Sequence, residues 1–208
     1  MTRLTWATRI TLLRVLLIIP FVMLMLNINK EQYPQGERDF FRYLATVIFV
    51  VMALSDAVDG YLARHKKQVT KLGAFLDPMA DKLLMMSALL LLASKTAMVP
   101  GFRVPVEVVV IIIGKDMFLL IGFFVTFMFT QQVKVQPVYI GKIATALQLI
   151  MVGFVLLAPE FSKAIPYYKL GLEVLWWSVA GMAIVATAIY IRTGSGYIEE
   201  VEKDNGAK

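Results

Sequence analysis

Six long apolar segments restrict what this chain can fold into more than any other feature of its sequence. An α-helix needs about 20 mostly apolar residues to cross the hydrocarbon core of a membrane. The segments have about this length, and Pro, Gly and polar residues punctuate the breaks between them; they cover residues 9–27, 40–62, 73–93, 104–128, 139–158 and 170–191. The sequence therefore predicts an all-α, polytopic membrane protein with six transmembrane helices.

The composition of the chain excludes several classes of function. Hydrophobic residues make up 59% of the 208 residues and charged residues 17%, which is too apolar for a typical soluble domain. The chain has no cysteine and one histidine, His65, so we expect neither disulfides nor a histidine-rich zinc site. The formal charge of +6 would suit nucleic acid or anionic lipid, and the apolar segments favour membrane lipids over nucleic acid.

The apolar segments occupy most of the chain, so we expect residues 1–208 to form a single membrane domain. The first segment is longer than the apolar region of a typical signal peptide, and no small-x-small cleavage pattern follows it, so we expect a retained helix. Residues from about 198 to 208 are acidic and polar, and we expect them to form a frayed end.

The distribution of Lys and Arg predicts how the chain sits in its membrane. With six spans, both termini share one side with the connections between spans 2 and 3 and between spans 4 and 5. That side holds eleven Lys and Arg residues, including the cluster at 64–67, and the opposite side holds seven. Because cytoplasmic connections carry an excess of positive charge, we expect this side to face the cytoplasm. The brevity of the chain and the lack of a transit peptide favour a bacterial inner membrane.

Spans 2 and 3 contain four aspartates, Asp56, Asp59, Asp77 and Asp81. Charged groups inside a membrane are costly and need a compensating partner. The spacings of three and four residues place each pair on one face of its helix, and the short connection brings both pairs to a similar depth. Four facing carboxylates repel one another unless protons or cations compensate them, and Mg²⁺ and Mn²⁺ prefer oxygen ligands. The alternatives are a polar network without chemistry and a proton or cation pathway.

The residues around these aspartates form a longer pattern. It reads Asp56-x2-Asp59-Gly60-x2-Ala63-Arg64-x8-Gly73-x3-Asp77-x3-Asp81 and resembles the complete signature of the CDP-alcohol phosphatidyltransferases. The resemblance implies that Asp56, Asp59 and Asp77 ligate two divalent cations, Mg²⁺ or Mn²⁺, which hold the pyrophosphate of a CDP-linked lipid. It implies that Asp81 is the general base for the acceptor hydroxyl and also a metal ligand. The nucleotide pocket would be lined by Gly60, Ala63, Arg64 and Gly73, and the family resemblance also suggests a homodimer.

The first apolar segment carries a further element of this kind. It contains Thr8-x-x-Thr11-x-x-Arg14, where relatives often have Asn-x-x-Thr-x-x-Arg, so Thr8 replaces the asparagine. We assign Thr11 to binding of the CDP-lipid and Arg14 to an acceptor phosphate. The alternative for Arg14 is an interfacial side chain that reaches out to the lipid headgroups.

Two lysines are further candidates for binding the acceptor phosphate. The fifth segment opens with Gly141-Lys142-x-x-Thr145-x-x-Gln148, which resembles an element of phosphatidylglycerophosphate and cardiolipin synthases. Lys142 lies near the start of this segment, and the alternative is that it anchors the segment at the cytoplasmic membrane surface. The fourth segment contains Lys115 beside Asp116, and both charges are costly there unless they line a polar cavity.

Three functions compete for this sequence. The run from Gly73 to Lys82 resembles phosphatidylglycerophosphate synthases, which predicts transfer of a phosphatidyl group from CDP-diacylglycerol to glycerol 3-phosphate, with release of CMP. The run from Gly114 to Asp116 resembles CDP-dependent cardiolipin synthases, whose acceptor is phosphatidylglycerol, and many glycerophosphate-using relatives carry Arg-Glu there. A cation transporter is the third reading, and it leaves the spacing of Gly60, Ala63, Arg64 and Gly73 unexplained. We favour glycerol 3-phosphate as the acceptor.

Overall fold

The structure is a computed structural model that describes the backbone of residues 6–66, 71–130 and 139–206, and the side chains of residues 9, 11–55, 79–122, 124 and 140–192. The described residues form seven helices and no strand. The helices are α1 (Trp6–Met25), α2 (Gln35–Lys66), α3 (Lys71–Ala93), α4 (Val106–Thr130), α5 (Tyr139–Leu156), α6 (Ala158–Ala164) and α7 (Tyr168–Gly206). The prediction of an all-α fold is confirmed.

Six of the seven helices coincide with the six apolar segments, and two features differ from the sequence-based expectation. The sequence does not predict α6, which begins directly after α5 at an angle of 74° to it. Pro159 lies in the first turn of α6, where proline starts a helix without the loss of a hydrogen bond. The polar tail is also helical, since α7 continues to Gly206; its Glu and Lys residues are good helix formers and no proline interrupts them.

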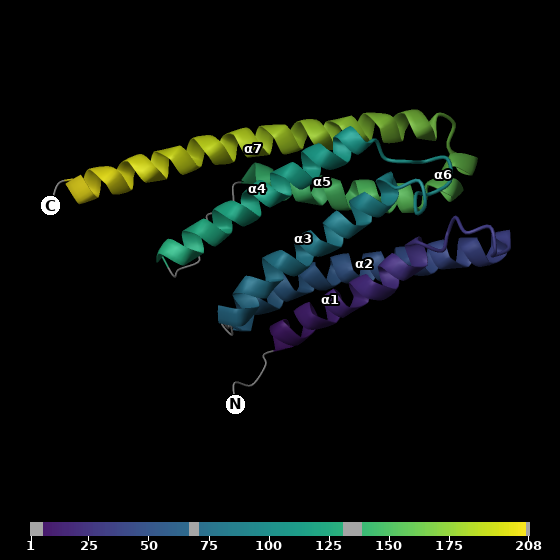
Figure 1. Ribbon diagram of the computed structural model, residues 1–208, viewed down its shortest axis with the longest axis horizontal. Helices are drawn as coiled ribbons and strands as arrows, with labels where there is room; N and C mark the ends of the chain where they lie inside the picture. Colours follow the sequence, from purple (N-terminus) through teal and green to yellow (C-terminus); the bar gives the residue numbers. More distant parts are fainter. Residues whose placement is uncertain (1–5, 67–70, 131–138, 207–208) are drawn as a thin grey trace.

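The six long helices run up and down along the length of the molecule (Figure 1). The beginning of α1, the end of α2, the beginning of α3 and the end of α7 lie towards one end. We name it the aspartate end, because the segments of α2 and α3 that carry Asp56, Asp59, Asp77 and Asp81 belong to it. The opposite end holds α6 and the connections from α1 to α2 and from α3 to α4, and we name it the Glu160 end.

The helices pack in two groups, which α3 joins together with a contact between α2 and α5. Helix α1 packs against α2 and α3, whereas α4 and α5 both pack against α7, and α3 also contacts α4 and α5. Between the groups lie fully buried side chains such as Met25, Leu89 and Met151. At Gly141, α5 approaches α7 so closely that an added Cβ would meet the hydroxyl group of Tyr190.

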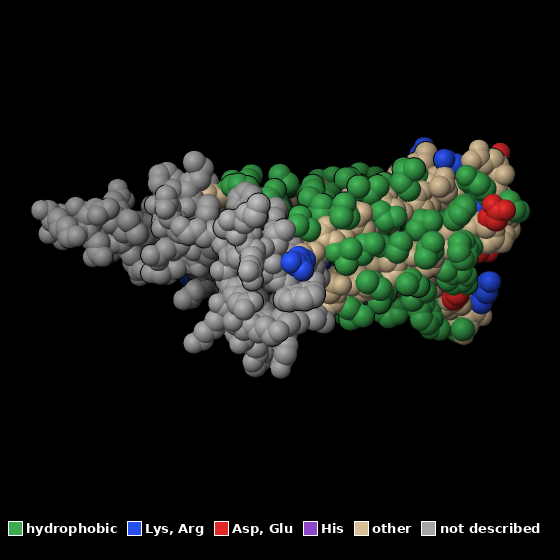
Figure 2. All heavy atoms as spheres, turned by 90° about the horizontal axis from the view of Figure 1, so that it is seen from below, with side chains coloured by type: hydrophobic (Ala, Val, Ile, Leu, Met, Phe, Trp, Pro, Cys, Tyr) green, Lys and Arg blue, Asp and Glu red, His purple; other side chains and the backbone are tan. Residues whose placement is uncertain are grey.

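The outer surface of the bundle is apolar along much of its described length. Figure 2 shows a continuous band of hydrophobic side chains, with most of the charged side chains in view gathered at the Glu160 end. Large apolar residues are exposed on several helices, among them Leu16, Ile19, Val110 and Val174, each more than 60% exposed. Contiguous apolar surface of this kind is unfavourable in water and marks a surface that contacts lipid or another protein.

Length and hydropathy identify fewer spans than the sequence predicts. Among the described residues, one helix is long and apolar enough to cross a membrane alone, over Tyr168–Arg192. The bent pair of α5 and α6 would be a second, and the described apolar part of α1, Thr11–Met25, is shorter. The structure therefore contains one or two clear spanning candidates and does not establish six.

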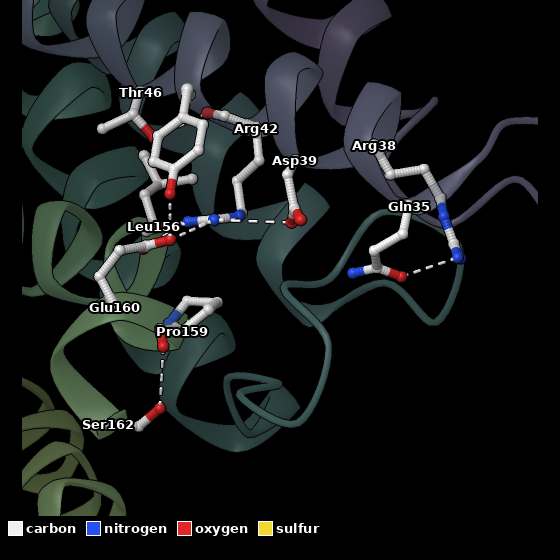
Figure 3. Close-up of polar contacts among 10 residues, drawn as sticks. Gln35, Arg38, Asp39, Arg42, Thr46, Leu156, Pro159, Glu160 and Ser162 are labelled. Carbon is white, nitrogen blue, oxygen red and sulfur yellow. Dashed lines mark hydrogen bonds and ion pairs between the residues drawn. The ribbon is translucent and has the colours of Figure 1, made fainter. Parts of the chain in front are cut away.

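An ion pair fastens α2 to the corner between α5 and α6 at the Glu160 end (Figure 3). Arg42 is 3% exposed, and its Nη1 donates to Oε2 of Glu160 at 2.7 Å and to the carbonyl oxygen of Leu156 at 2.9 Å. Its Nη2 pairs with the other carboxylate oxygen of Glu160. Leu156 is the last residue of α5, so Arg42 satisfies a carbonyl group that has no partner within that helix.

Tyr43 completes this contact from the solvent side. Its hydroxyl group donates to Oε1 of Glu160 at 2.7 Å, and the guanidinium group of Arg42 lies 4.6 Å from the centre of its ring. The hydrogen bonds from Arg42 are the main cause that lowers the pKa of Glu160 to about 2. Glu160 is therefore ionised at every pH at which the protein is expected to work.

Candidate active site

The backbone places the four signature aspartates at matching depths of two consecutive helices. Asp56 lies ten residues before the end of α2, and Asp81 lies ten residues after the start of α3. Asp59 and Asp77 lie closer to the same two helix ends. Because a helix rises 1.5 Å per residue, and only residues 67–70 join the two helices, the two pairs belong to one level of the aspartate end.

The chemistry of this donor set fits hard divalent cations, which prefer carboxylate oxygens. Among the four aspartates the structure describes one side chain, that of Asp81; those of Asp56, Asp59 and Asp77 lie outside the described side chains. Within the described part of the chain, no three His, Cys, Asp or Glu side chains form a metal-binding group. Convergence on a metal site therefore stays a prediction.

The residues assigned to the nucleotide pocket lie on the same two helices as the aspartates. Gly60, Ala63 and Arg64 lie in the last two turns of α2, and Gly73 lies in the first turn of α3. Their side-chain surroundings lie outside the described residues. Their proposed contacts with the cytidine nucleotide are thus untested predictions.

Asp81 stands at the edge of a cluster of charged side chains that the sequence pattern does not predict. The Nζ of Lys82 lies 3.6 Å from Oδ2 of Asp81 and 2.9 Å from Oδ1 of Asp116. The Nζ of Lys115 lies 3.0 Å from the same oxygen of Asp116. One carboxylate of α4 therefore holds two ammonium groups, one of them from α3.

Gln148 of α5 braces this carboxylate from the other side. Its Nε2 donates to Oδ2 of Asp116 at 3.3 Å, and its Oε1 accepts from Nζ of Lys115 at 3.4 Å. We name Asp81, Lys82, Lys115, Asp116 and Gln148 the lysine–aspartate cluster. Its two lysines and two aspartates carry opposite formal charges that cancel, which is the condition under which buried charges are tolerated.

The lysine–aspartate cluster accounts for the charges of Lys115 and Asp116 in another way than the sequence-based prediction. The sequence predicts that Lys115 and Asp116 line a polar cavity, but both are buried, at 3% and 0% exposure. Lys82 and Gln148 satisfy them instead. Neither the contact of Asp116 with Lys82 nor the role of Gln148 is predicted from the sequence, although a carboxylate and a glutamine within apolar segments are the signals that point to them.

The other assigned residues lie on α1 and α5. Thr11 and Arg14 are buried, at 0% and 2% exposure, within the helix that packs against α2 and α3. Arg14 therefore faces the interior of the bundle and does not reach out to the headgroups from an exposed position. Lys142 is exposed in the first turn of α5. The roles of all three in binding substrates stay predictions.

Comparison with known proteins identifies the class to which this site belongs. A family model described as CDP-alcohol phosphatidyltransferase matches residues 4–190. The chain belongs to the CDP-alcohol phosphatidyltransferase family, which confirms the resemblance found in the aspartate pattern.

Three curated relatives with the name CDP-diacylglycerol--glycerol-3-phosphate 3-phosphatidyltransferase are similar to this chain. The protein of Bacillus subtilis (strain 168) is 34% identical over 157 residues, which cover 72% of this chain and 75% of the relative. The protein of Escherichia coli (strain K12) is 29% identical over 185 residues, which cover 87% and 85%. The protein of Haemophilus influenzae is 41% identical over 83 residues, which cover 40% of each chain.

Proposed function

We propose that this protein transfers the phosphatidyl group of CDP-diacylglycerol to glycerol 3-phosphate, which gives phosphatidylglycerophosphate and CMP. The observation that carries the proposal is the complete eight-position signature, which falls at matching depths of α2 and α3. The names of relatives that align with most of the chain support glycerol 3-phosphate as the acceptor.

Each residue of the signature has a role in this reaction. The acceptor hydroxyl oxygen attacks the phosphorus on the lipid side of the pyrophosphate, and the bond from that phosphorus to the CMP oxygen breaks. Asp81 takes the hydroxyl proton as general base. Arg64, with Gly60, Ala63, Gly73 and Thr11, binds the CDP-lipid.

Asp56, Asp59, Asp77 and Asp81 would hold two divalent cations, Mg²⁺ or Mn²⁺. When bound, such cations neutralise the negative charge that develops on the pyrophosphate and hold it in position. The carboxylate oxygens of the chain are suitable ligands for them, as the donor chemistry described above indicates.

Among the three acceptor candidates, Lys142 has the most suitable surroundings. Glycerol 3-phosphate carries a dianionic phosphate, which an exposed ammonium group can bind. Lys142 is exposed, whereas Lys115 already contacts Asp116 and Gln148. Arg14 is buried, so it would bind a phosphate that enters the interior of the bundle between α1 and its neighbours.

The membrane arrangement belongs to the same proposal. Six spans are supported by the up-and-down helices and by the exposed apolar band (Figures 1 and 2). The distribution of Lys and Arg supports an aspartate end that faces the cytoplasm of a bacterial inner membrane. Two copies would form a homodimer, as the family resemblance suggests.

One assay tests the activity. Purified protein receives Mg²⁺ or Mn²⁺ and CDP-diacylglycerol, together with glycerol 3-phosphate, phosphatidylglycerol or no acceptor, and CMP release is measured. We expect release with glycerol 3-phosphate. Release with phosphatidylglycerol alone would make the protein a cardiolipin synthase, and ion flux without cytidine chemistry would favour a transporter.

A labelling experiment tests the orientation. The chain has no cysteine, so single cysteines can be introduced in place of Lys67, which directly follows α2 in the sequence, and of Gly101, at the Glu160 end. We expect a membrane-impermeant thiol reagent to label intact cells at position 101 only. Labelling at position 67 only would reverse the proposed orientation.

A further inference from the structure

We propose that Asp116 is a positioning residue that holds the ammonium group of Lys82 away from the carboxylate of Asp81. The proposal rests on the proposed function, in which Asp81 accepts the proton of the acceptor hydroxyl and also binds a cation. Asp116 lies outside the family signature and has no role in the reaction as described above.

The position of Lys82 is the first observation. Lys82 directly follows Asp81 in α3, and successive residues of a helix point about 100° apart. Its Nζ nevertheless lies between two carboxylates, 2.9 Å from Asp116 and 3.6 Å from Asp81. The closer contact is with α4, so α4 determines on which side of the gap the ammonium group rests.

The second observation is that Asp116 has a fixed position. Its side chain is fully buried, Lys115 lies 3.0 Å from one of its oxygens, and Gln148 donates to the other. A carboxylate without access to water depends on such partners to remain ionised and in place. Asp116 is therefore braced from α4 and α5 and can act as a rigid anchor for Lys82.

The consequence for Asp81 follows from the distances. If Asp116 loses its charge, Lys82 is left with a side chain that is 13% exposed and needs an anionic partner. Asp81 is the nearest described carboxylate, and a movement of less than about 1 Å brings the ammonium group into full hydrogen-bond contact with it. The ammonium group would then occupy the oxygen that must accept a proton or a cation.

A set of suppressor variants tests this mechanism through Mn²⁺ binding. Asp116→Asn should weaken the affinity for Mn²⁺ about tenfold, within the range of coupling between contacting residues. The double variant Asp116→Asn/Lys82→Met should return to within about threefold of the wild type, because the displaced ammonium group is gone. Free Mn²⁺ is measured by electron paramagnetic resonance during titration, and CMP release is recorded on the same samples.

Asp116→Asn/Lys115→Met is the matched control, because it removes the same charges from the same cluster but leaves Lys82. We expect it to stay about tenfold weak. Equal recovery in both double variants would mean that the cluster needs only charge balance. Recovery in neither would mean that Asp116 is a structural tie among α3, α4 and α5. Either result overturns the proposal.

The single variant Lys82→Met keeps the test decisive if Asp116→Asn does not fold. It should keep Mn²⁺ affinity within about threefold of the wild type, and a tenfold loss would overturn the proposal.

The experiments distinguish a failure of the proposed function from a failure of the role proposed for Asp116. If the wild type releases no CMP with any acceptor but the Mn²⁺ pattern appears, the proposed function is wrong and the role of Asp116 stands. If the wild type is active and the pattern is absent, the reverse holds.

Discussion

The Arg42–Glu160 pair and the lysine–aspartate cluster both join helices through opposite charges, but they use different side chains in different surroundings. At the Glu160 end, a planar guanidinium group meets a carboxylate with both of its oxygens, and Glu160 remains 33% exposed. Within the bundle, two lysines share one oxygen of a carboxylate that is fully buried. Arginine forms a directional fork, whereas lysine is a compact charge that accepts several geometries.

Because of this difference, the Arg42–Glu160 pair holds its helices in one fixed geometry, whereas the contacts of Lys82 can shift between two carboxylates. The Arg42 contacts leave both carboxylate oxygens of Glu160 occupied and close a carbonyl group at the end of α5. The Lys82 contacts leave the ammonium group between two carboxylates, one of which belongs to the signature. We therefore expect changes at the Glu160 end to alter stability, and changes near the aspartates to alter turnover.

The largest expected effect is the loss of a signature aspartate. Asp59→Asn should lower CMP release by a factor of roughly a thousand, because bound cations contribute several kcal/mol of transition-state stabilisation and an amide is a poor substitute ligand. The matched control is Asp39→Asn, at the other end of the same helix α2, which should stay within about twofold. Near-normal turnover of the Asp59 variant would exclude the proposed metal site.

A smaller effect is expected for the acceptor. Lys142→Ala should raise the KM for glycerol 3-phosphate roughly tenfold or more, since a hydrogen bond to a charged group contributes about 1.5–3 kcal/mol. The KM for the CDP-lipid should change little. Lys169→Ala removes another exposed lysine, at the Glu160 end, and should alter neither KM. If both variants behave alike, Lys142 has no specific role at the acceptor site.

The sequence predicts the helices well because long apolar segments leave few alternatives. It does not predict α6, since a helix of seven residues, Ala158–Ala164, at the end of an apolar segment gives no periodic signal. It also predicts a frayed tail after residue 198, whereas good helix formers extend α7 to Gly206. Both differences arise where the sequence carries no periodic apolar pattern.

The site is predictable in part for a related reason. The signature aspartates lie close together in sequence, and their spacing alone relates them to one another. The contacts of Asp116 depend on how α3, α4 and α5 are rotated against each other, and the pair of Arg42 and Glu160 joins residues 118 positions apart. No single segment specifies these rotations, so the partners of a buried charge emerge only from the packed bundle.

Loss of the Arg42–Glu160 pair should lower the stability of the protein more than its activity. Arg42→Met leaves Glu160 and the carbonyl group of Leu156 without their main donor, which should cost about 2 kcal/mol. For a chain of this length that corresponds to a decrease of roughly 4–8 °C in the midpoint of thermal denaturation in detergent. Arg42→Lys keeps the charge without the fork and should lose less. Specific activity below the transition should stay near that of the wild type, and a selective loss of activity would remove the distinction between the two ends.

The smallest expected effect is a pH dependence of the stability that arises from protonation of Glu160. Its pKa in the folded protein is about 2, below the value of 4.5 for an unperturbed glutamate. A lowered pKa means that the stabilisation is present above pH 4.5 and disappears as the pH falls towards 2, where the carboxylate becomes protonated. Because the group is partly exposed, solvent screening keeps this contribution modest. Glu160→Gln should be less stable than the wild type at neutral pH, and its denaturation midpoint should change less between pH 4.5 and pH 2. Equal slopes for both proteins across that interval would show that the Arg42 contact does not depend on the charge of Glu160.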